Sequence, residues 1–158
     1  MSKAKTVGLS LLLDLLLPAL LGAAATLGFA PFGYYGLTFL ALVGLIALWW
    51  PATTGRGAWR GFVFGLAHFG TGIYWTFVST YYYGGAPLPM AIGLVCLLTV
   101  YMSLYPAFVG ALAGFTRRLP RTLWAIAVLP GAWLLAELVR SWVMTGFPWL
   151  SLGYALID

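Results

Sequence analysis

The basic residues of this chain fall into three short clusters separated by long apolar stretches, and this spacing limits what the chain can fold into. Seven of the eight Lys and Arg residues belong to the clusters, at positions 3–5, 56–60 and 117–121. A bilayer crossing needs about 20 apolar residues, so each stretch between clusters is long enough to cross out and back. All three clusters therefore return to one side, which the positive-inside bias predicts to be the cytoplasm.

The composition excludes a soluble globular domain. The chain of 158 residues is 63% hydrophobic and 7% charged, whereas soluble domains carry about 25% charged residues. A formal charge of +5 would suggest nucleic acid as a partner of a soluble protein. Here the basic residues border apolar stretches and have a topological explanation, so no nucleic-acid partner is expected.

Hydropathy predicts an all-α polytopic transmembrane helix bundle of about five spans, with the N-terminus inside and the C-terminus outside. The candidate spans are residues 7–27, 35–50, 61–81, 88–115 and 122–142. The second is short, so the first two can instead form a shallow hairpin, and the long fourth span is expected to tilt or to bend at Pro106. Pro18 and Pro130 are predicted to kink their helices. Glycines at 57, 61, 65, 110 and 114 predict closely packed helices.

Three uncharged connections share the predicted outer face, at residues 28–36, 81–89 and 145–154. All three are dense in Gly, Pro and aromatic residues. An aromatic belt with turn residues explains part of this pattern. Tryptophans also occur at the inner ends, so the Gly and Pro content of the outer connections favours shaped, partly buried loops.

Two charged residues stand near the outer end of the fifth predicted span. Glu137 and Arg140 are three residues apart and so share one helix face. They form either a structural ion pair that supports the following loop, or a site at which Arg140 binds a polar headgroup through its phosphate. Asp14 is expected to mark the cytoplasmic end of the first helix, where the helix dipole favours an acidic group.

The chain has one cysteine, Cys96, and one histidine, His68. An internal disulfide is impossible and no metal-ligand spacing exists, so we expect no metal site and no cofactor. Cys96 is predicted to be a buried apolar side chain. His68 is predicted to pack inside a helix bundle, with proton handling as the alternative. No set of residues for nucleophilic catalysis is evident.

Several motifs together resemble the N-terminal membrane domain of bacterial apolipoprotein N-acyltransferases, over nearly the whole chain. The first is Gly-Phe-Ala-Pro-Phe at 28–32. The second is Gly-Phe-Val-Phe-Gly at 61–65, leading to Gly-Ile-Tyr-Trp at 72–75 and Val-Ser at 78–79. The most specific is Ala-Glu-Leu-Val-Arg-Ser-Trp at 136–142, which runs into Thr-Gly-Phe-Pro-Trp-Leu-Ser-Leu-Gly-Tyr at 145–154.

This resemblance implies an enzyme that moves an acyl chain from a phospholipid to the free amine of a lipoprotein's diacylglyceryl-cysteine. The family does so through a thioester on the cysteine of a Glu-Lys-Cys set, in a nitrilase-like domain that follows further spans. This sequence does not reach that domain, so we expect a single transmembrane domain at 1–158 that is truncated and inactive alone. Cys96 has no adjacent base or cation and cannot replace the missing nucleophile.

The resemblance also assigns a lipid-access site. The family's functionally important Trp of the Phe-Pro-Trp motif corresponds to Trp149, which we expect to guide an acyl chain together with Gly146, Phe147, Pro148 and Arg140. An ordinary belt tryptophan is the alternative.

The function expected from the sequence is membrane anchoring and lipid access for an acyltransferase of the bacterial inner membrane. Its partners would be a phospholipid acyl donor, a lipoprotein acceptor in the full-length enzyme, and membrane lipids. A small multispanning permease and a non-catalytic membrane scaffold are the rival hypotheses.

Overall fold

The computed structural model describes residues 3–156, and all the regular secondary structure in this part is helical, with no strand. The first helix comprises α1 (Lys3–Leu11), the π-helical turn η1 (Leu12–Leu16) and α2 (Leu17–Thr26). Then come α3 (Tyr35–Trp49), α4 (Thr54–Gly72), α5 (Trp75–Val78), the π-helical turn η2 (Ser79–Tyr83) and α6 (Leu88–Phe115). The last helix comprises α7 (Arg121–Leu123), the π-helical turn η3 (Trp124–Val128) and α8 (Leu129–Arg140), before short 3₁₀ turns at Val143–Thr145 and Leu152–Leu156.

Three of these helices are long and apolar enough to cross a membrane. They are Val7–Thr26, Leu88–Phe115 and Arg121–Arg140, and they match the first, fourth and fifth predicted spans to within a few residues. The second predicted span corresponds to α3, an apolar helix of 15 residues. The count of five crossings and their orientation stay predictions.

The third predicted span, 61–81, is interrupted in the structure, where α4 covers its first part and α5 and η2 its second. Helix α4 ends at Gly72, Ile73 leaves the helical region with φ −109° and ψ 14°, and α5 starts at Trp75. Glycines at 70 and 72 weaken the helix at this point. The break turns the chain so that Trp75 comes to lie beside the C-terminal segment described below.

Each of the two prolines predicted to kink a helix directly follows a widened π-helical turn. Before Pro18, the Leu17 N–H donates to the Leu12 carbonyl, and before Pro130 the Leu129 N–H donates to the Trp124 carbonyl. Proline offers no N–H to continue the α-helical ladder and crowds the preceding turn. The wider turn accommodates this within an otherwise continuous helix.

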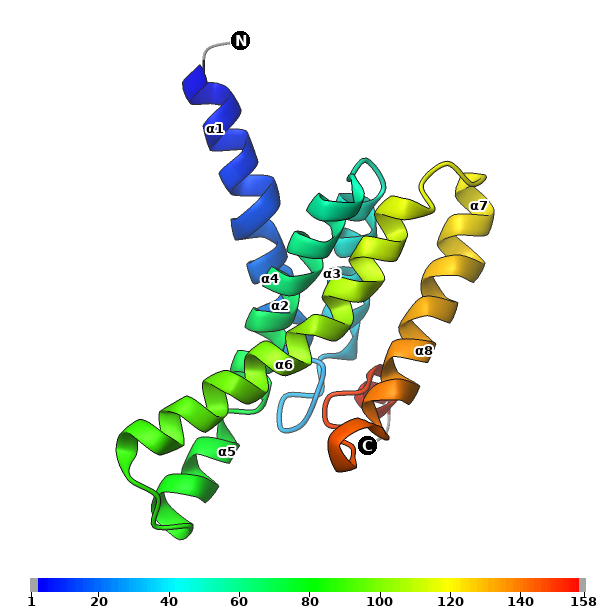
Figure 1. Ribbon diagram of the computed structural model, residues 1–158. Coiled ribbons are helices and arrows are strands. Elements are labelled where there is room, and N and C mark those ends of the chain that lie inside the picture. Colours follow the sequence, from blue (N-terminus) through cyan, green and yellow to red (C-terminus); the bar gives the residue numbers. More distant parts are fainter. Residues whose placement is uncertain (1–2, 157–158) are drawn as a thin grey trace.

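Helices α4 and α6 pack in direct backbone contact, as the glycine spacing predicted. A Cβ atom on Gly57 would collide with the Gly110 carbonyl, and one on Gly61 would collide with the Pro106 carbonyl. A Cβ on Gly65 would lie 2.8 Å from Ser103 Cα. Glycine at these positions therefore allows α4 and α6 to lie together at the centre of the bundle (Figure 1).

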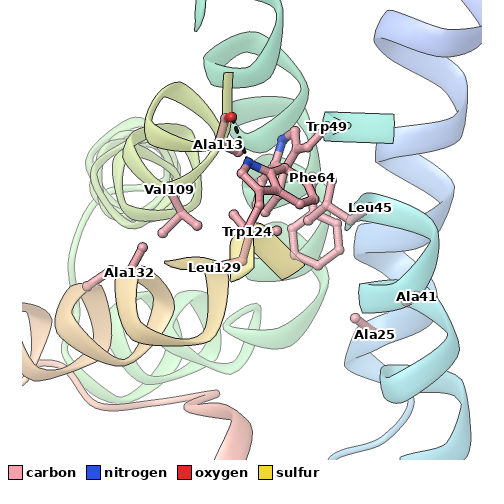
Figure 2. Close-up of a cluster of buried hydrophobic side chains, with 11 residues drawn as sticks. Ala25, Ala41, Leu45, Trp49, Phe64, Val109, Ala113, Trp124, Leu129 and Ala132 are labelled. Atoms are coloured by element: carbon pink, nitrogen blue, oxygen red, sulfur yellow. Dashed lines mark hydrogen bonds between the residues drawn. The ribbon is translucent and has the colours of Figure 1, made fainter. Parts of the chain in front are cut away.

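The main buried cluster lies among α2, α3, α4, α6 and the last helix. Figure 2 shows Trp49, Phe64 and Trp124 meeting there, with Trp124 Nε1 donating to the Ala113 carbonyl at 3.0 Å. Trp49 Nε1 likewise donates to the Gly57 carbonyl at 3.0 Å. Each indole thus fills the core and satisfies its N–H on a neighbouring helix.

The connection that precedes Arg56 and the connection that carries Arg117 and Arg118, here called the basic connections, lie at one end of the bundle, and the Gly-rich connections lie at the other. Residues 50–53 and 116–120 are at the same end as the N-terminus, whereas residues 27–34 and the C-terminal segment are at the opposite end (Figure 1). The side chains of Lys3 and Lys5 lie outside the described part. This arrangement agrees with the alternation of inner and outer connections that the sequence predicts.

Asp14 does not cap a helix, so its predicted role at a helix terminus was wrong. It lies inside the first helix and pairs with Arg60 of α4, with Asp14 Oδ1 at 2.7 Å from both Arg60 Nε and Arg60 Nη2. Arg60 also donates to the Leu48 carbonyl near the end of α3. The buried Arg60 therefore joins three helices through one carboxylate and one carbonyl.

Candidate functional site

The segment after α8 turns back against the bundle. Gly146 permits this reversal, because its φ of +80° is in the left-handed region and a Cβ there would collide with the Ser141 carbonyl. The Phe147 N–H then donates to the Arg140 carbonyl at 3.2 Å. Leu150 adopts a φ of +58° and is buried in the cluster formed with Phe69 and other apolar residues. One side chain thus anchors the returning segment in the protein interior.

Glu137 and Arg140 of α8 hold the residues that follow Leu150. Glu137 Oε1 accepts hydrogen bonds from the Leu152 N–H at 2.9 Å and from Trp133 Nε1 at 3.0 Å. Arg140 Nη2 donates to Ser151 Oγ at 2.6 Å. Each charged residue therefore binds the returning segment.

The direct ion pair that the sequence suggested between these two residues is not formed. Within residues 3–156, the ion pairs that the structure shows join Asp14 to Arg56 and to Arg60. The spacing of Glu137 and Arg140 would allow a pair, but each side chain has a closer partner in the returning segment. Glu137 and Arg140 hold the following loop through these separate hydrogen bonds, and not through contact with each other.

Arg140 is buried, with 3% of its surface exposed, and so does not present its guanidinium to a lipid headgroup in this structure. The guanidinium carbon lies 5.4 Å from the centre of the Phe69 ring. Beside it is a cavity of about 20 Å³, whose lining includes His68, Tyr105 and Glu137. Arg140 Nε has no hydrogen-bond partner within the described residues, and a cavity of this size can hold a water molecule.

Trp149 stands at the edge of an open groove of about 670 Å³. Its ring centre is 5.1 Å from that of Trp75 and 6.4 Å from that of Phe147. Trp149 is 50% exposed, and Pro148 before it is also exposed. The groove is lined by Thr26, Phe29, Ala30, Pro31, Phe32, Thr71, Gly72, Tyr74, Trp75, Trp149, Leu150 and Tyr154.

Two of the three Gly- and Pro-rich connections meet at this groove. Residues 29–32 form one wall and residues 149–154 contribute another, with the break between α4 and α5 beside them. The third connection, at 84–87, lies apart at the far end of α5 (Figure 1). The sequence thus identified two of the contributing segments, but gave no sign that Trp75 would face Trp149.

The histidine and the cysteine have different surroundings from each other. His68 is 2% exposed and packs against Phe64 and Phe69, and its Nδ1 is 3.1 Å from Thr26 Oγ1. A packed interior histidine is therefore confirmed.

Cys96 is exposed, so the prediction of a buried side chain was wrong. It lies on the first half of α6, which extends beyond the centre of the bundle (Figure 1).

The sequence analysis missed two residues, Trp133 and Ser151, that bond to Glu137 and Arg140 where these hold the returning segment. Trp133 lies four residues before Glu137, on the same helix face, and this spacing could have identified it as a donor. Ser151 links two parts of the site, because its Oγ accepts from Arg140 and donates to the Pro148 carbonyl at 2.7 Å. No local pattern indicates that contact, since it depends on how the segment returns.

These features define an integral membrane domain of helices, with an aromatic-rimmed groove at one end. The domain is similar over residues 21–158 to the family described as the apolipoprotein N-acyltransferase N-terminal domain. The chain belongs to this family.

Individual relatives agree with this assignment. The chain is 42% identical over 140 residues to the apolipoprotein N-acyltransferase of Methylococcus capsulatus, covering 87% of this chain and 27% of the relative. It is 40% identical over 149 residues to that of Shewanella oneidensis and 43% identical over 145 residues to that of Photobacterium profundum, covering 90% and 91% of this chain and 28% of each relative. The chain thus spans about a quarter of the length of the curated relatives it matches.

Proposed function

We propose that this chain is the membrane domain of an apolipoprotein N-acyltransferase and gives lipid substrates access to a catalytic domain. The observation that carries the proposal is the groove bordered by Trp149 and Trp75, at the end of the bundle opposite the basic connections. An apolar, aromatic groove suits a hydrocarbon chain. The substrates would be a phospholipid acyl donor and a lipoprotein acceptor, with membrane lipids around the helices.

Glu137 and Arg140 of α8 do not line the groove, and in this proposal they fix the position of the segment that does. Glu137 and Arg140 fix Leu152 and Ser151, and these residues together with Leu150 determine where Trp149 stands. Gly146 and Phe147 set the point at which the segment returns. In this proposal Arg140 positions Trp149 through the backbone, and Trp149 itself contacts the acyl chain.

Covalent chemistry is assigned to a part of the enzyme that this sequence does not contain. Cys96 has apolar residues, Gly or Thr at the positions one, three and four residues away, so no base on its own helix can activate it. The domain alone should therefore form no thioester and no N-acylated product. Mass spectrometry after incubation with phospholipid and a diacylglyceryl peptide tests this, and a Cys96 acyl-enzyme would contradict it.

The proposed setting is the bacterial inner membrane, with five crossings and the basic connections in the cytoplasm. Support comes from the arrangement of the connections at the two ends of the bundle (Figure 1). Reporter fusions after Gly55 and Arg118 should report the cytoplasm, and a fusion after Gly85 should report the opposite side. If fusions after Gly55 and Gly85 report the same side, the arrangement of five crossings is refuted.

The role of Trp149 can be tested in an enzyme completed with the catalytic domain of a relative. Trp149→Ala should lower acyl transfer about three- to tenfold, because losing about 1 kcal/mol of apolar contact with the acyl chain changes a rate by roughly that factor. Abundance in the membrane should not change. Trp142→Ala is the matched control, because Trp142 is 83% exposed and does not line the groove. Equal activity of the Trp149→Ala and Trp142→Ala enzymes would refute the proposed role.

A further inference from the structure

Four aromatic side chains that line the groove beside Trp149 carry hydrogen-bond donors. These rim rings are the indoles of Trp75 and Trp149 and the phenols of Tyr74 and Tyr154. Each of the four side chains is at least 36% exposed. No residue between 3 and 156 accepts a hydrogen bond from their N–H or O–H groups. The four donors are therefore available to a ligand in the groove.

The two threonines of the lining add no free donor to the rim rings. A threonine hydroxyl has one hydrogen to donate. Thr71 Oγ1 donates to the Ala67 carbonyl at 2.7 Å, and Thr26 Oγ1 donates to the His68 carbonyl at 3.0 Å. The free side-chain donors of the groove thus belong to the same rings that give it an apolar surface.

None of the described residues that line the groove is charged. A phosphate or an ammonium group moved from water into this groove would have no counterion, which is costly. An ester carbonyl is neutral and only accepts hydrogen bonds, so it suits donors on apolar rings. The groove of about 670 Å³ is within the range of ligand pockets, about 300–1,000 Å³. Its chemistry therefore favours the ester region of a lipid over the headgroup.

We propose that the groove binds the glycerol diester of a lipid, with the ester carbonyls on the donors of the rim rings and the headgroup outside. This inference rests on the proposed function, and it adds recognition of the ester to contact with the acyl chain. Trp and Tyr rings are favoured at the membrane interface, which is where the esters of a lipid lie. A phospholipid donor and a diacylglyceryl acceptor share this diester, so one groove suits both.

Competition between ester and ether lipids tests the proposal by native mass spectrometry of the purified 158-residue chain. The micelles contain equal amounts of a diester lipid and of the diether lipid with the same headgroup and chain length, which has no carbonyl. The chain should retain the diester about fivefold in excess, the factor for one hydrogen bond of about 1 kcal/mol. The excess should be the same for phosphatidylglycerol, phosphatidylethanolamine and a diacylglyceryl-cysteine peptide, because each pair differs only in its carbonyls.

A variant with phenylalanine at all four rim positions removes the donors and keeps apolar rings. Its substitutions are Tyr74→Phe, Trp75→Phe, Trp149→Phe and Tyr154→Phe. This variant should still retain lipid but should lose the diester excess. The matched control is Tyr83→Phe/Trp142→Phe, because these two side chains are 86% and 83% exposed and do not line the groove. The control should keep the full diester excess.

Equal retention of diester and diether lipids by the unaltered chain would overturn the proposal. A diester excess that persists in the four-ring variant, or that occurs with only one headgroup, would also overturn it. These outcomes are distinct from the test of the proposed function. Acyl transfer by the Trp149→Ala enzyme decides whether the groove serves the reaction, whereas the ratio of ester to ether decides whether the rim donors recognise the ester.

Discussion

Removing the carboxylate of Asp14 should destabilise the fold strongly, because it leaves the buried Arg60 without its counterion. Arg60 is 5% exposed, and its Nε and Nη2 both reach Asp14 Oδ1 at 2.7 Å. In Asp14→Ala the guanidinium keeps its bond to the Leu48 carbonyl but has no anion. A buried cation without a counterion is costly, because water cannot replace the lost partner.

The expected loss is about 3 kcal/mol. Hydrogen bonds to charged groups contribute about 1.5–3 kcal/mol each, and breaking a buried ion pair costs about 3–5 kcal/mol. The Asp14 side chain is 21% exposed and Arg60 retains the Leu48 carbonyl, so the lower end of these ranges applies. For a chain of this size about 1 kcal/mol shifts the Tm by roughly 2–4 °C, which predicts a fall of about 6–12 °C.

Thermal unfolding in detergent micelles measures this loss for Asp14→Ala, Arg60→Met and the double variant Asp14→Ala/Arg60→Met. The double variant should lose clearly less than the sum of the two single losses, because it leaves no unpaired charge. Arg56→Gln is the control, since Arg56 is exposed and 4.0 Å from Asp14, and it should cost less than about 1 kcal/mol. Additive losses, or an Asp14→Ala loss no larger than that of Arg56→Gln, would refute the reasoning.

Two further predictions concern the support of the groove and the packing of the bundle. Glu137→Ala should destabilise the fold by about 1–3 kcal/mol in thermal unfolding, because the Leu152 N–H and Trp133 Nε1 lose their acceptor. Glu137→Gln should recover part of this stability, because one side-chain oxygen remains as an acceptor. Equal losses in both variants would argue against the hydrogen bonds. Gly110→Leu should prevent stable folding, because a Cβ there would collide with the Gly57 carbonyl, whereas Gly93→Leu on the open face of the same helix should be tolerated in the same assay.

The sequence predicted the helical class and most helix positions because hydropathy is a local property. Helix α6 begins and ends at the predicted residues, and the glycine spacing predicted the close approach of α4 and α6. The break at Ile73 was missed because the stretch remains apolar on both sides of it. Hydropathy registers whether a segment is apolar, and it carries no information on whether the helix is continuous.

The partners of the charged residues could not be predicted because they are distant along the chain. Arg60 is 46 residues from Asp14, and Leu152 is 15 residues from Glu137. Local spacing suggested that Glu137 would pair with Arg140, three residues away. The returning segment brings a backbone N–H and a hydroxyl to these two side chains instead, and only the folded path of residues 146–152 determines this.

The polar support of the groove explains why a largely apolar helix retains Glu137 and Arg140. Charged groups near the centre of a bilayer cost about 2.5–3.5 kcal/mol each on insertion scales and less near its surface. Leu150 alone can anchor the returning segment through apolar contacts, but such contacts tolerate sliding along the chain. A carboxylate bonded to the Leu152 N–H and a guanidinium bonded to Ser151 are satisfied in one register only. The charges therefore fix the position of the backbone next to Trp149, which an apolar anchor could not do.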